Sequence, residues 1–319
     1  MRMKAWITTL VAAVCLASTA HADVSIRIGG AGTDASPDTK AMEVFAEKLK
    51  ERLGAAASVE LFPNSHLGTV DEMVEQVKGS VLECMYESVG VLGSFHPAAN
   101  IEGVAYIYKD EDHFFRIWRS AVGEEVLDDI AKQAGIRVVG PAFHGFRHIL
   151  TNKPINKVED LEGMKIRAPG IPAYIESIRA LGANPATVAF EEVYAALQSH
   201  VVDGVEQPLT AIKDKRFYEV DKNLALTSHM AETMGFMCNA DWFDGLDEAT
   251  QKAITDSATD SADWYRTYTD ESQAALLNEL EADGVVVTKP DLAPFMAKAA
   301  EAKYDPALEP VIAKFRSVE

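Results

Sequence analysis

The sequence predicts an α/β protein with two lobes that are joined by crossing strands and spanned by one long helix. Three observations support this prediction. Strand-like and helix-like patterns alternate along most of the chain, as in proteins whose parallel sheets are covered by helices. A helical pattern without proline extends from Leu246 to Ala282, about 37 residues or roughly 55 Å at 1.5 Å per residue. No low-complexity linker divides the chain, so we expect strands rather than a flexible tether between the lobes.

Residues 1–22 have the pattern of a secretory signal peptide. Arg2 and Lys4 precede an apolar run from Ala5 to Ala17, and Ala20-His21-Ala22 is a cleavage site of the A-x-A type. We therefore expect export to a bacterial periplasm, with cleavage after Ala22. The apolar run is too short for a stable membrane helix, and no later stretch is long and apolar enough, so we predict no membrane insertion of the mature chain.

The first lobe is expected to begin with three strands that alternate with two helices. Val24, Ile26 and Ile28 alternate with polar residues and predict the first strand. A loop rich in Gly, Asp, Ser and Pro follows over residues 29–37, and we interpret it as a turn open to a ligand. Further patterns predict helices at 42–53, 67–79 and 110–135, and strands at 58–62, 81–86 and 136–139.

The second lobe is predicted from the region 147–208 and from the end of the chain. Strand-like runs at Arg147 and Arg167 are followed by a helix at 174–181, which Gly182 ends, and by a second helix from Phe190. The later patterns predict a mixed helix and loop at 210–225, a strand at 235–239 that returns to the first lobe, a strand at 285–287 and a closing helix from Pro290. We place the first lobe at residues 23–144 plus about 233–272, and the second at 145–232 plus about 273–319.

Candidate binding side chains stand near the ends of predicted strands. Arg167 lies just before the Pro169-Gly170 break, and ligands of parallel α/β sheets bind beyond the carboxyl ends of strands. A guanidinium binds a carboxylate through two parallel hydrogen bonds. The alternative for Arg147 and for Arg167 is a salt bridge to one of the 49 acidic residues. Glu87, just past the strand at 81–86, is equally a ligand contact or the partner of a helix terminus.

No pattern for a metal, a cofactor or catalysis is present, and we predict none of the three. His144 and His148 are four residues apart, but they lie in a strand-like segment rather than on a helix. Glu191-Glu192 is better explained as charge in the first turn of a helix than as an acid/base pair. The net charge of −19 argues against nucleic acid and against an anionic membrane surface as partners.

Two cysteines, Cys84 and Cys238, remain after removal of the signal peptide. Export permits a disulfide, but the sequence does not show that the two residues meet. Each lies in an apolar strand-like run, so we favour two buried free thiols.

Five segments, in order and at matching spacing, resemble the solute-binding component of the tripartite ATP-independent periplasmic (TRAP) transporters, DctP type. They are TNKPI (Thr151–Ile155), EDLEGMKIRAPG (Glu159–Gly170), ALGANP (Ala180–Pro185), FEEVYAALQ (Phe190–Gln198) and VVDGVEQP (Val201–Pro208). The resemblance implies a periplasmic binding protein fold of two lobes. It also implies that two membrane permease subunits, driven by an ion gradient, are the partners.

The resemblance also implies a ligand-binding site. Arg167 falls on the arginine that clamps the ligand carboxylate in this family, and Arg147 falls on a second arginine that commonly faces the ligand. We expect both guanidinium groups to be hydrated before the ligand binds. The remaining implied positions are the aromatic Phe190, the amide Gln207, where relatives often carry Asn, and Glu87 and Gly30, which match polar positions of sialic-acid-type relatives.

These features predict a periplasmic receptor that binds a small organic acid and delivers it to the membrane permease for import. Polar Glu87 and Gln207 beside a carboxylate clamp favour a hydroxylated acid such as a sugar acid. A C4-dicarboxylate is the alternative, since Arg147 could take a second carboxylate. A periplasmic enzyme acting on such an acid, or a protein that presents it to a sensor kinase, are further alternatives. The sequence favours a receptor because no nucleophile, base or metal pattern accompanies the arginines.

Overall fold

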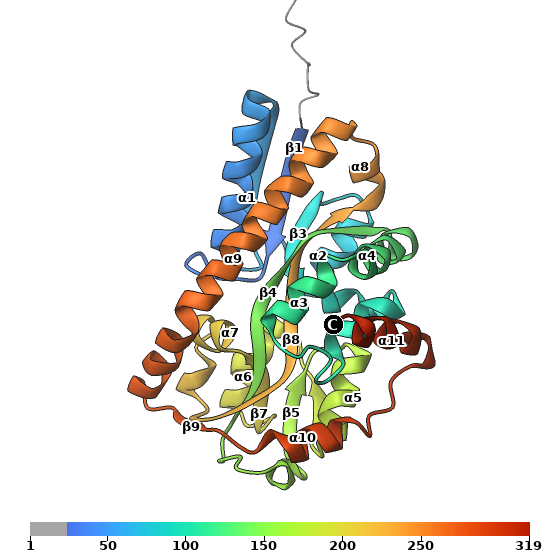
Figure 1. Cartoon of the computed structure of the whole chain (residues 1–319). Coiled ribbons are helices and arrows are strands. Elements are labelled where there is room, and N and C mark those ends of the chain that lie inside the picture. Colours follow the sequence, from blue (N-terminus) through green and yellow to red (C-terminus); the bar gives the residue numbers. More distant parts are fainter. Residues whose placement is uncertain (1–23) are drawn as a thin grey trace, which may run out of the picture.

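The computed structural model describes residues 24–319, and the predicted signal peptide at 1–22 lies outside them. Figure 1 shows an elongated molecule in which one continuous sheet runs between two lobes and one helix runs along both. The predicted two-lobed α/β fold is confirmed.

The first lobe contains three parallel strands, as the alternating pattern predicts. Side-chain caps begin its helices: Ser36 accepts a hydrogen bond from the N–H of Thr39, and Thr69 forms a capping box with Glu72. The elements of this lobe are β1 (Val24–Gly30), α1 (Pro37–Leu53), β2 (Ala57–Phe62), α2 (Val70–Lys78), β3 (Cys84–Ser88), α3 (Glu111–Trp118), α4 (Ala121–Ala134) and α8 (Ala240–Asp244).

The predicted single helix at 110–135 is wrong, because two helices occupy this segment. The break falls at Arg119 and Ser120, between α3 and α4. The hydroxyl of Ser120 accepts a hydrogen bond from the N–H of Val122 and thereby caps the start of α4. A serine that bonds the nearby backbone in this way competes with helix continuation. Apolar residues keep the helical spacing across the break, so periodicity alone does not show that the helix ends.

The second lobe also contains parallel strands with helices between them. Pro172 stands in the first turn of its first helix, where the missing N–H costs nothing. The elements are β5 (Lys165–Ala168), α5 (Pro172–Ala180), β6 (Asn184–Thr187), α6 (Val193–Gln198), β7 (Gly204–Pro208), α7 (Leu209–Asp214), β9 (Val286–Thr288) and α10 (Leu292–Ala299).

Two long antiparallel strands, β4 (Ile136–Thr151) and β8 (Asn223–Asn239), connect the lobes. The predicted strands at 136–139 and 235–239 are therefore only the ends of much longer ones. Irregularities in register interrupt their pairing at three places, and such bulges bend and twist a strand pair. The strand order is β2-β1-β3-β8-β4-β7-β5-β6, with β9 beside β8, so the crossing strands form the middle of the sheet.

The predicted long helix is confirmed as α9 (Glu248–Ala282), with 35 residues. It packs against α1 in the first lobe, against β4, and against α7 in the second lobe (Figure 1). Small residues on its buried face, such as Ala258, allow close approach to the sheet. Gly140 in β4, with φ 64°, lies against this helix, and a Cβ there would be 2.4 Å from the carbonyl oxygen of Ala258.

The prediction of two free thiols is wrong, because Cys84 and Cys238 form a disulfide. The two residues are directly paired across the antiparallel strands β3 and β8, and both are fully buried. The bond therefore ties the last strand of the first lobe to a crossing strand. Because the pairing joins residues 154 positions apart, local sequence patterns give no sign of it.

The last helix, α11 (Glu309–Ser317), returns to the first lobe. Phe315 packs edge-on against Trp118 of α3, and Ile312 joins the same core. This segment lies in the range that we assigned to the second lobe, so its packing departs from that assignment. The reason is that the chain crosses between the lobes once more after α10. The other lobe boundaries stay predictions.

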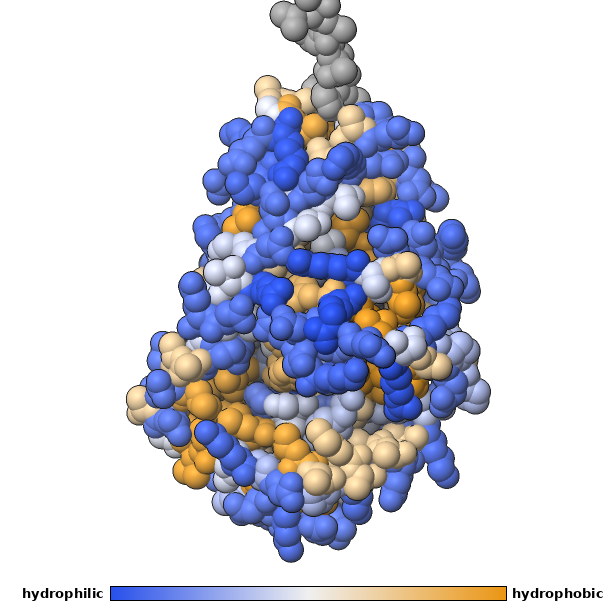
Figure 2. Space-filling view, in the orientation of Figure 1, coloured by the Kyte–Doolittle hydropathy of each residue, from blue (hydrophilic) through white to orange (hydrophobic). Residues whose placement is uncertain are grey.

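The surface is mainly hydrophilic on the face shown in Figure 2, in keeping with the acidic composition. Apolar side chains gather there around the lower end of α9. Over residues 24–319 no helix, α9 included, combines the length and apolarity needed to cross a membrane.

Candidate functional site

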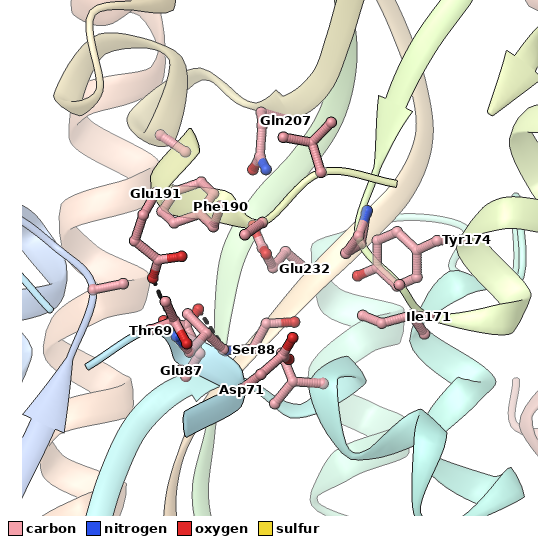
Figure 3. Close-up of a pocket in the computed structure, with 18 of the residues that line it drawn as sticks. Thr69, Asp71, Glu87, Ser88, Ile171, Tyr174, Phe190, Glu191, Gln207 and Glu232 are labelled. Carbon is pink, nitrogen blue, oxygen red and sulfur yellow. Dashed lines mark hydrogen bonds between the residues drawn. The ribbon is translucent and has the colours of Figure 1, made fainter. Parts of the chain in front are cut away.

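A cavity of about 390 Å³ lies between the lobes and is lined by residues of both. Figure 3 shows Glu87 and Ser88, from β3 of the first lobe, across the cavity from Gln207 of β7. Five predicted site residues line this cavity, namely Arg147, Arg167, Gln207, Glu87 and Phe190. The arrangement places these side chains where a small molecule would be enclosed by both lobes.

Gly30 is not among the lining residues, although its neighbours Ala31 and Gly32 are. A Cβ at Gly30 would lie 3.2 Å from the terminal methyl of Met42 and 3.5 Å from the carbonyl oxygen of Tyr86. Position 30 therefore faces the packed interior of the first lobe. At this strand end, Ala31 and Gly32 line the cavity in place of Gly30.

Arg167 presents an uncommitted guanidinium to the cavity. It lies near the carboxyl end of β5 and is only 3% exposed. Its Nε donates to the carbonyl oxygen of Val188 at 2.9 Å, and neither Nη group makes a hydrogen bond or an ion pair within residues 24–319. Burial lowers the pKa of Arg167 to about 10, which leaves it charged at neutral pH. A buried cation without an anionic partner is a natural receptor for a carboxylate.

Phe190 forms one side of the cavity next to this cation. Its ring lies 5.9 Å from the guanidinium carbon of Arg167, and Nζ of Lys215 lies 5.5 Å from the same ring. Two cations thus interact with one aromatic ring, which holds its orientation. The position agrees with the pocket-lining role that the family resemblance implies for Phe190.

Arg147 lines the same cavity, but its charge is already matched. Its Nη2 donates to a carboxylate oxygen of Glu206 at 2.8 Å, and its Nη1 pairs with Glu232 at 2.7 Å. Desolvation opposes the charged form, but the two carboxylates outweigh it and raise the pKa of Arg147 well above its usual value. The salt-bridge alternative therefore holds for this arginine, and the expectation that its guanidinium is hydrated before binding is wrong.

A buried chain of charges continues from Arg147 into the first lobe, and sequence reasoning missed it. His144 lies between Glu232 and Asp38, with nitrogen–oxygen distances of 2.8 and 3.2 Å. Desolvation lowers the pKa of His144, but the two carboxylates raise it overall to about 10. Tyr265 of α9 donates to Asp38 at 2.9 Å. The pairing of β4 with β8 brings His144 and Glu232 together, and the packing of α1 and α9 adds Asp38 and Tyr265, so no spacing in the sequence could reveal them.

Gln207 and Glu87 are polar groups with unused hydrogen-bonding capacity. Gln207 is 4% exposed, and its side-chain amide makes no hydrogen bond to any residue of the described chain. Glu87 accepts from the N–H of Ser88 through Oε1 at 3.1 Å, whereas its Oε2 has no hydrogen-bond partner in the part of the chain that the structure describes. A buried amide is normally paired, so Gln207 indicates a polar ligand, and the half-buried carboxyl of Glu87 offers a second polar contact.

The wall next to Arg147 is held by a buried carboxyl group. Tyr174 stacks over the Arg147 guanidinium at 5.0 Å and donates to Glu102 at 2.6 Å. Glu102 also accepts from the hydroxyl of Ser88 and from the N–H of Gly90. These bonds fix the loop after β3 against α5 and hold the cavity wall in one arrangement.

Side chains of the second lobe also contact the first lobe at the rim of the cavity. Asp214 of α7 accepts hydrogen bonds from both the N–H and the hydroxyl of Thr33. Next to it, Nζ of Lys215 donates to the carbonyl oxygen of Ala31 at 2.6 Å. Both contacts engage the loop after β1, so they join the lobes directly.

Glu191 makes a further contact of this kind and corrects our interpretation of the Glu191-Glu192 pair. Its carboxylate accepts from the N–H of Val70, the first residue of α2, at 3.1 Å and from the hydroxyl of Ser65 at 3.2 Å (Figure 3). It therefore interacts with the start of a helix in the other lobe rather than with its own. We call the contacts of Asp214, Lys215 and Glu191 the inter-lobe contacts.

The part of the chain that the structure describes contains no group of three or more His, Cys, Asp or Glu side chains placed to hold a metal ion. His144, considered above for its spacing to His148, instead pairs with two carboxylates. Among residues 24–319, the cavity offers a ligand the Nη groups of Arg167 and several hydrogen-bonding side chains.

The fold and the site define a two-lobed solute-binding protein whose ligand cavity lies between the lobes. More particularly, the chain belongs to the DctP family, bacterial extracellular solute-binding protein family 7, whose model matches residues 28–307. The predicted family is thereby confirmed.

Three relatives illustrate this membership. The sialic acid-binding periplasmic protein SiaP of Vibrio cholerae is 29% identical over 289 residues, which cover 91% of this chain and 90% of that protein. A TRAP periplasmic solute-binding protein from Roseobacter denitrificans with bound β-D-glucuronate has a TM-score of 0.86 and 30% identity, over 93% of this chain and 100% of that one. Another from that species, with bound L-galactonate, has a TM-score of 0.87 and 26% identity, with the same coverage. The chain is accordingly a TRAP-type receptor and not an enzyme.

Proposed function

We propose that this protein binds a small organic acid, of the hydroxylated or sugar-acid type, and delivers it to the membrane permease of a TRAP system for import. The observation that carries the proposal is the pair of Nη groups of Arg167, which line the cavity without a partner among residues 24–319. They offer two parallel donors to one carboxylate. Gln207 and Glu87 supply hydrogen-bonding groups for the rest of the ligand.

The relatives support a sugar acid as the ligand class. Solved structures of similar proteins hold β-D-glucuronate and L-galactonate, and a similar protein of Escherichia coli is a 2,3-diketo-L-gulonate-binding periplasmic protein. Each of these ligands carries one carboxylate and several oxygen groups. That composition fits a cavity with one uncommitted arginine and polar side chains around it.

Binding is proposed to act through closure of the lobes. The ligand carboxylate binds Arg167, and closure removes water from the site, which strengthens these hydrogen bonds. The ligand shifts the open–closed equilibrium only by its higher affinity for the closed arrangement. Phe190 then covers the clamp, with Arg147 as a neighbour whose charge is satisfied within the protein.

Export, processing and the partner belong to the same proposal. We propose cleavage after Ala22, a periplasmic location for the mature chain and transfer of the ligand to the two TRAP membrane subunits. Apart from α11, the lobe boundaries stay as given above, at 144/145, about 232/233 and about 272/273.

A thermal-shift screen tests the ligand class. Residues 23–319 are refolded to remove carried-over ligand and screened against sugar acids, C4-dicarboxylates, keto acids and matched neutral sugars. A ligand at a hundredfold over its dissociation constant adds about 2.7 kcal/mol of stability, which is easily detected. Shifts with acids that disappear in Arg167→Ala support the proposal, whereas shifts with neutral sugars alone contradict it.

The same thermal-shift screen also tests the C4-dicarboxylate alternative. It needs Arg147 as the cation for a second carboxylate, but that guanidinium already contacts Glu206 and Glu232. We expect succinate and malate to give smaller shifts than the best sugar acid. A larger shift with either diacid would favour the alternative.

A further inference from the structure

The lining of the cavity is polar in one part and apolar in another. Arg167, Gln207 and Glu87 each offer a ligand at least one hydrogen-bonding group without a partner among residues 24–319. Val91 and Ile171 line the same cavity but have only hydrocarbon side chains. A carboxylate and hydroxyl groups on the ligand account for the first set of residues and leave the second set unexplained.

Three side chains form what we call the apolar corner of the cavity, namely Val91 of the first lobe and Ile171 and Tyr174 of the second. Ile171 and Tyr174 belong to one buried apolar cluster, and Val91 packs against it. Figure 3 shows Ile171 and Tyr174 close together, across the cavity from Phe190. Since Phe190 accompanies the guanidinium of Arg167, the apolar corner lies away from the aromatic wall of the carboxylate clamp.

The polar groups next to the apolar corner are already bonded within the protein. The hydroxyl of Tyr174 donates to Glu102 at 2.6 Å, and the hydroxyl of Ser88 donates to the same oxygen at 2.8 Å. The other oxygen of Glu102 accepts from the N–H of Gly90 at 2.6 Å. Because a hydroxyl has a single hydrogen, neither Tyr174 nor Ser88 has one left to donate to a ligand.

Phe95 adds a further apolar side chain from the first lobe. It follows Val91 by four residues, lines the cavity and packs, partly buried, against the first-lobe core. Nζ of Lys78 lies 3.7 Å from the centre of its ring, in a cation–π contact that holds the ring in place. Both lobes therefore contribute hydrocarbon groups, and a ligand group between them is enclosed when the lobes close.

Such a surface favours an alkyl group over a hydroxyl group. A methyl group placed against Val91 and Ile171 removes apolar surface from water on both sides of the contact, which is favourable. A hydroxyl in the same place would give up its bonds to water without gaining a new donor, which opposes binding. The difference between the two groups should therefore appear directly in the dissociation constant.

We propose that the apolar corner binds an alkyl group of the ligand, so that the protein prefers a hydroxylated acid with a methyl group over the matched acid without it. Val91 and Ile171 are then specificity-determining residues of the receptor. This inference rests on the proposed function, since Arg167 still holds the carboxylate. It narrows the ligand class to deoxy sugar acids and branched hydroxy acids.

Matched pairs of acids test the inference on the wild-type protein spanning residues 23–319. The pairs are L-galactonate and its 6-deoxy form, L-mannonate and its 6-deoxy form, and 2,4-dihydroxybutanoate without and with two methyl groups at C3. Calorimetric titration gives the two dissociation constants of each pair. We expect the alkyl-bearing member to bind about tenfold more tightly, or better, in at least one pair.

The variant Val91→Thr assigns this preference to the apolar corner. Threonine has nearly the shape of valine but brings a hydroxyl group into the corner, so the ratio of the two dissociation constants should fall by about threefold to tenfold. Changes in stability or in lobe closure affect both members of a pair and cancel in the ratio. Val122→Thr is the matched control, because Val122 of α4 does not line the cavity, and it should keep the wild-type ratio.

Equal or tighter binding of the more polar member in every pair overturns the inference but leaves the receptor function intact. The same holds if Val91→Thr keeps the wild-type ratio, or if none of the six acids binds while another acid of the thermal-shift screen does. If no acid of any kind binds, the proposed function itself fails, and this inference with it.

Discussion

Arg147 and Glu206 form a buried ion pair between neighbouring strands, with two donors of the guanidinium directed at the two carboxylate oxygens. Glu206 lies on β7, between the strand that carries Arg147 and the strand that carries Arg167. Of the two arginines, Arg147 is the one that forms an ion pair with this carboxylate. The two arginines that the sequence offers as ligand contacts are therefore unlike. Arg147 is paired within the protein, whereas the Nη groups of Arg167 have no partner among residues 24–319.

Loss of Arg147 should destabilise the protein strongly. Arg147→Met would leave Glu206 buried without its cation and Glu232 with His144 alone, which costs about 3–5 kcal/mol of the free energy of unfolding. Urea unfolding of the ligand-free protein measures this value. Adding Glu206→Gln should recover part of the loss, and a loss below about 1 kcal/mol in the single variant would contradict the pairing.

Loss of Arg167 should abolish ligand binding but leave the stability of the protein nearly unchanged. Arg167→Gln removes a desolvated charge that has no ionic partner, so we expect the free energy of unfolding to stay within about 1 kcal/mol of the wild type. Ligand binding should be lost. Arg167→Lys should weaken binding by about 2–4 kcal/mol, because an ammonium cannot offer two parallel donors. Calorimetry measures both, and unchanged affinity in the lysine variant would refute the clamp.

Loss of an inter-lobe contact should weaken the binding of every ligand by the same factor. Asp214→Ala removes two hydrogen bonds between the lobes, so the binding-competent fraction falls and each dissociation constant rises by the same ratio, about threefold to tenfold. Two acids of different size, titrated against wild type and variant, test this. Glu192→Ala serves as the control, since Glu192 makes no inter-lobe contact. Ratios that differ between the two acids would indicate a direct ligand contact instead.

Protonation of Glu232 at low pH should destabilise the folded protein. Its pKa is lowered to about 2: desolvation raises the pKa, but the charges of Arg147 and His144 lower it more. A depressed folded-state pKa gives stability that is present above the unfolded value near 4.5 and is lost as the pH falls towards 2. We expect the loss to be roughly 3 kcal/mol. Urea unfolding at pH 7 and pH 3 should show a smaller acid-induced loss in Glu232→Gln, and an equal loss would argue against this origin.

The disulfide should stabilise the exported protein. Unfolded, unreduced protein spanning residues 23–319 should show no reactive thiol, since Cys84 and Cys238 are bonded. The double variant Cys84→Ser/Cys238→Ser should lose about 2–4 kcal/mol of stability. Thiol titration and thermal unfolding measure these effects. Two reactive thiols would restore the free-thiol interpretation.

Local patterns predict most of the secondary structure correctly, and they fail at a capping side chain and along two buried strands. Apolar periodicity and the lack of proline are sufficient to define α9, because a helix depends on neighbours three and four positions away. The same argument misses the end of α3, where the Ser120 hydroxyl starts a new helix. It also underestimates β4 and β8, since a strand that is buried along its length shows no alternation.

The sequence by itself determines the family, the order of the elements and five side chains of the cavity, because these follow from local spacing and from motifs such as EDLEGMKIRAPG. Only the tertiary structure decides what those side chains can do. Arg147 is satisfied because strand order brings Glu206 beside it from 59 residues away. His144 is charged because strand pairing places it beside Glu232 and the packing of α1 places it beside Asp38. Ion pairing and burial are properties of distances in space, so the free cation of Arg167 and the unpaired carboxyl of Glu87 become visible only in the folded chain.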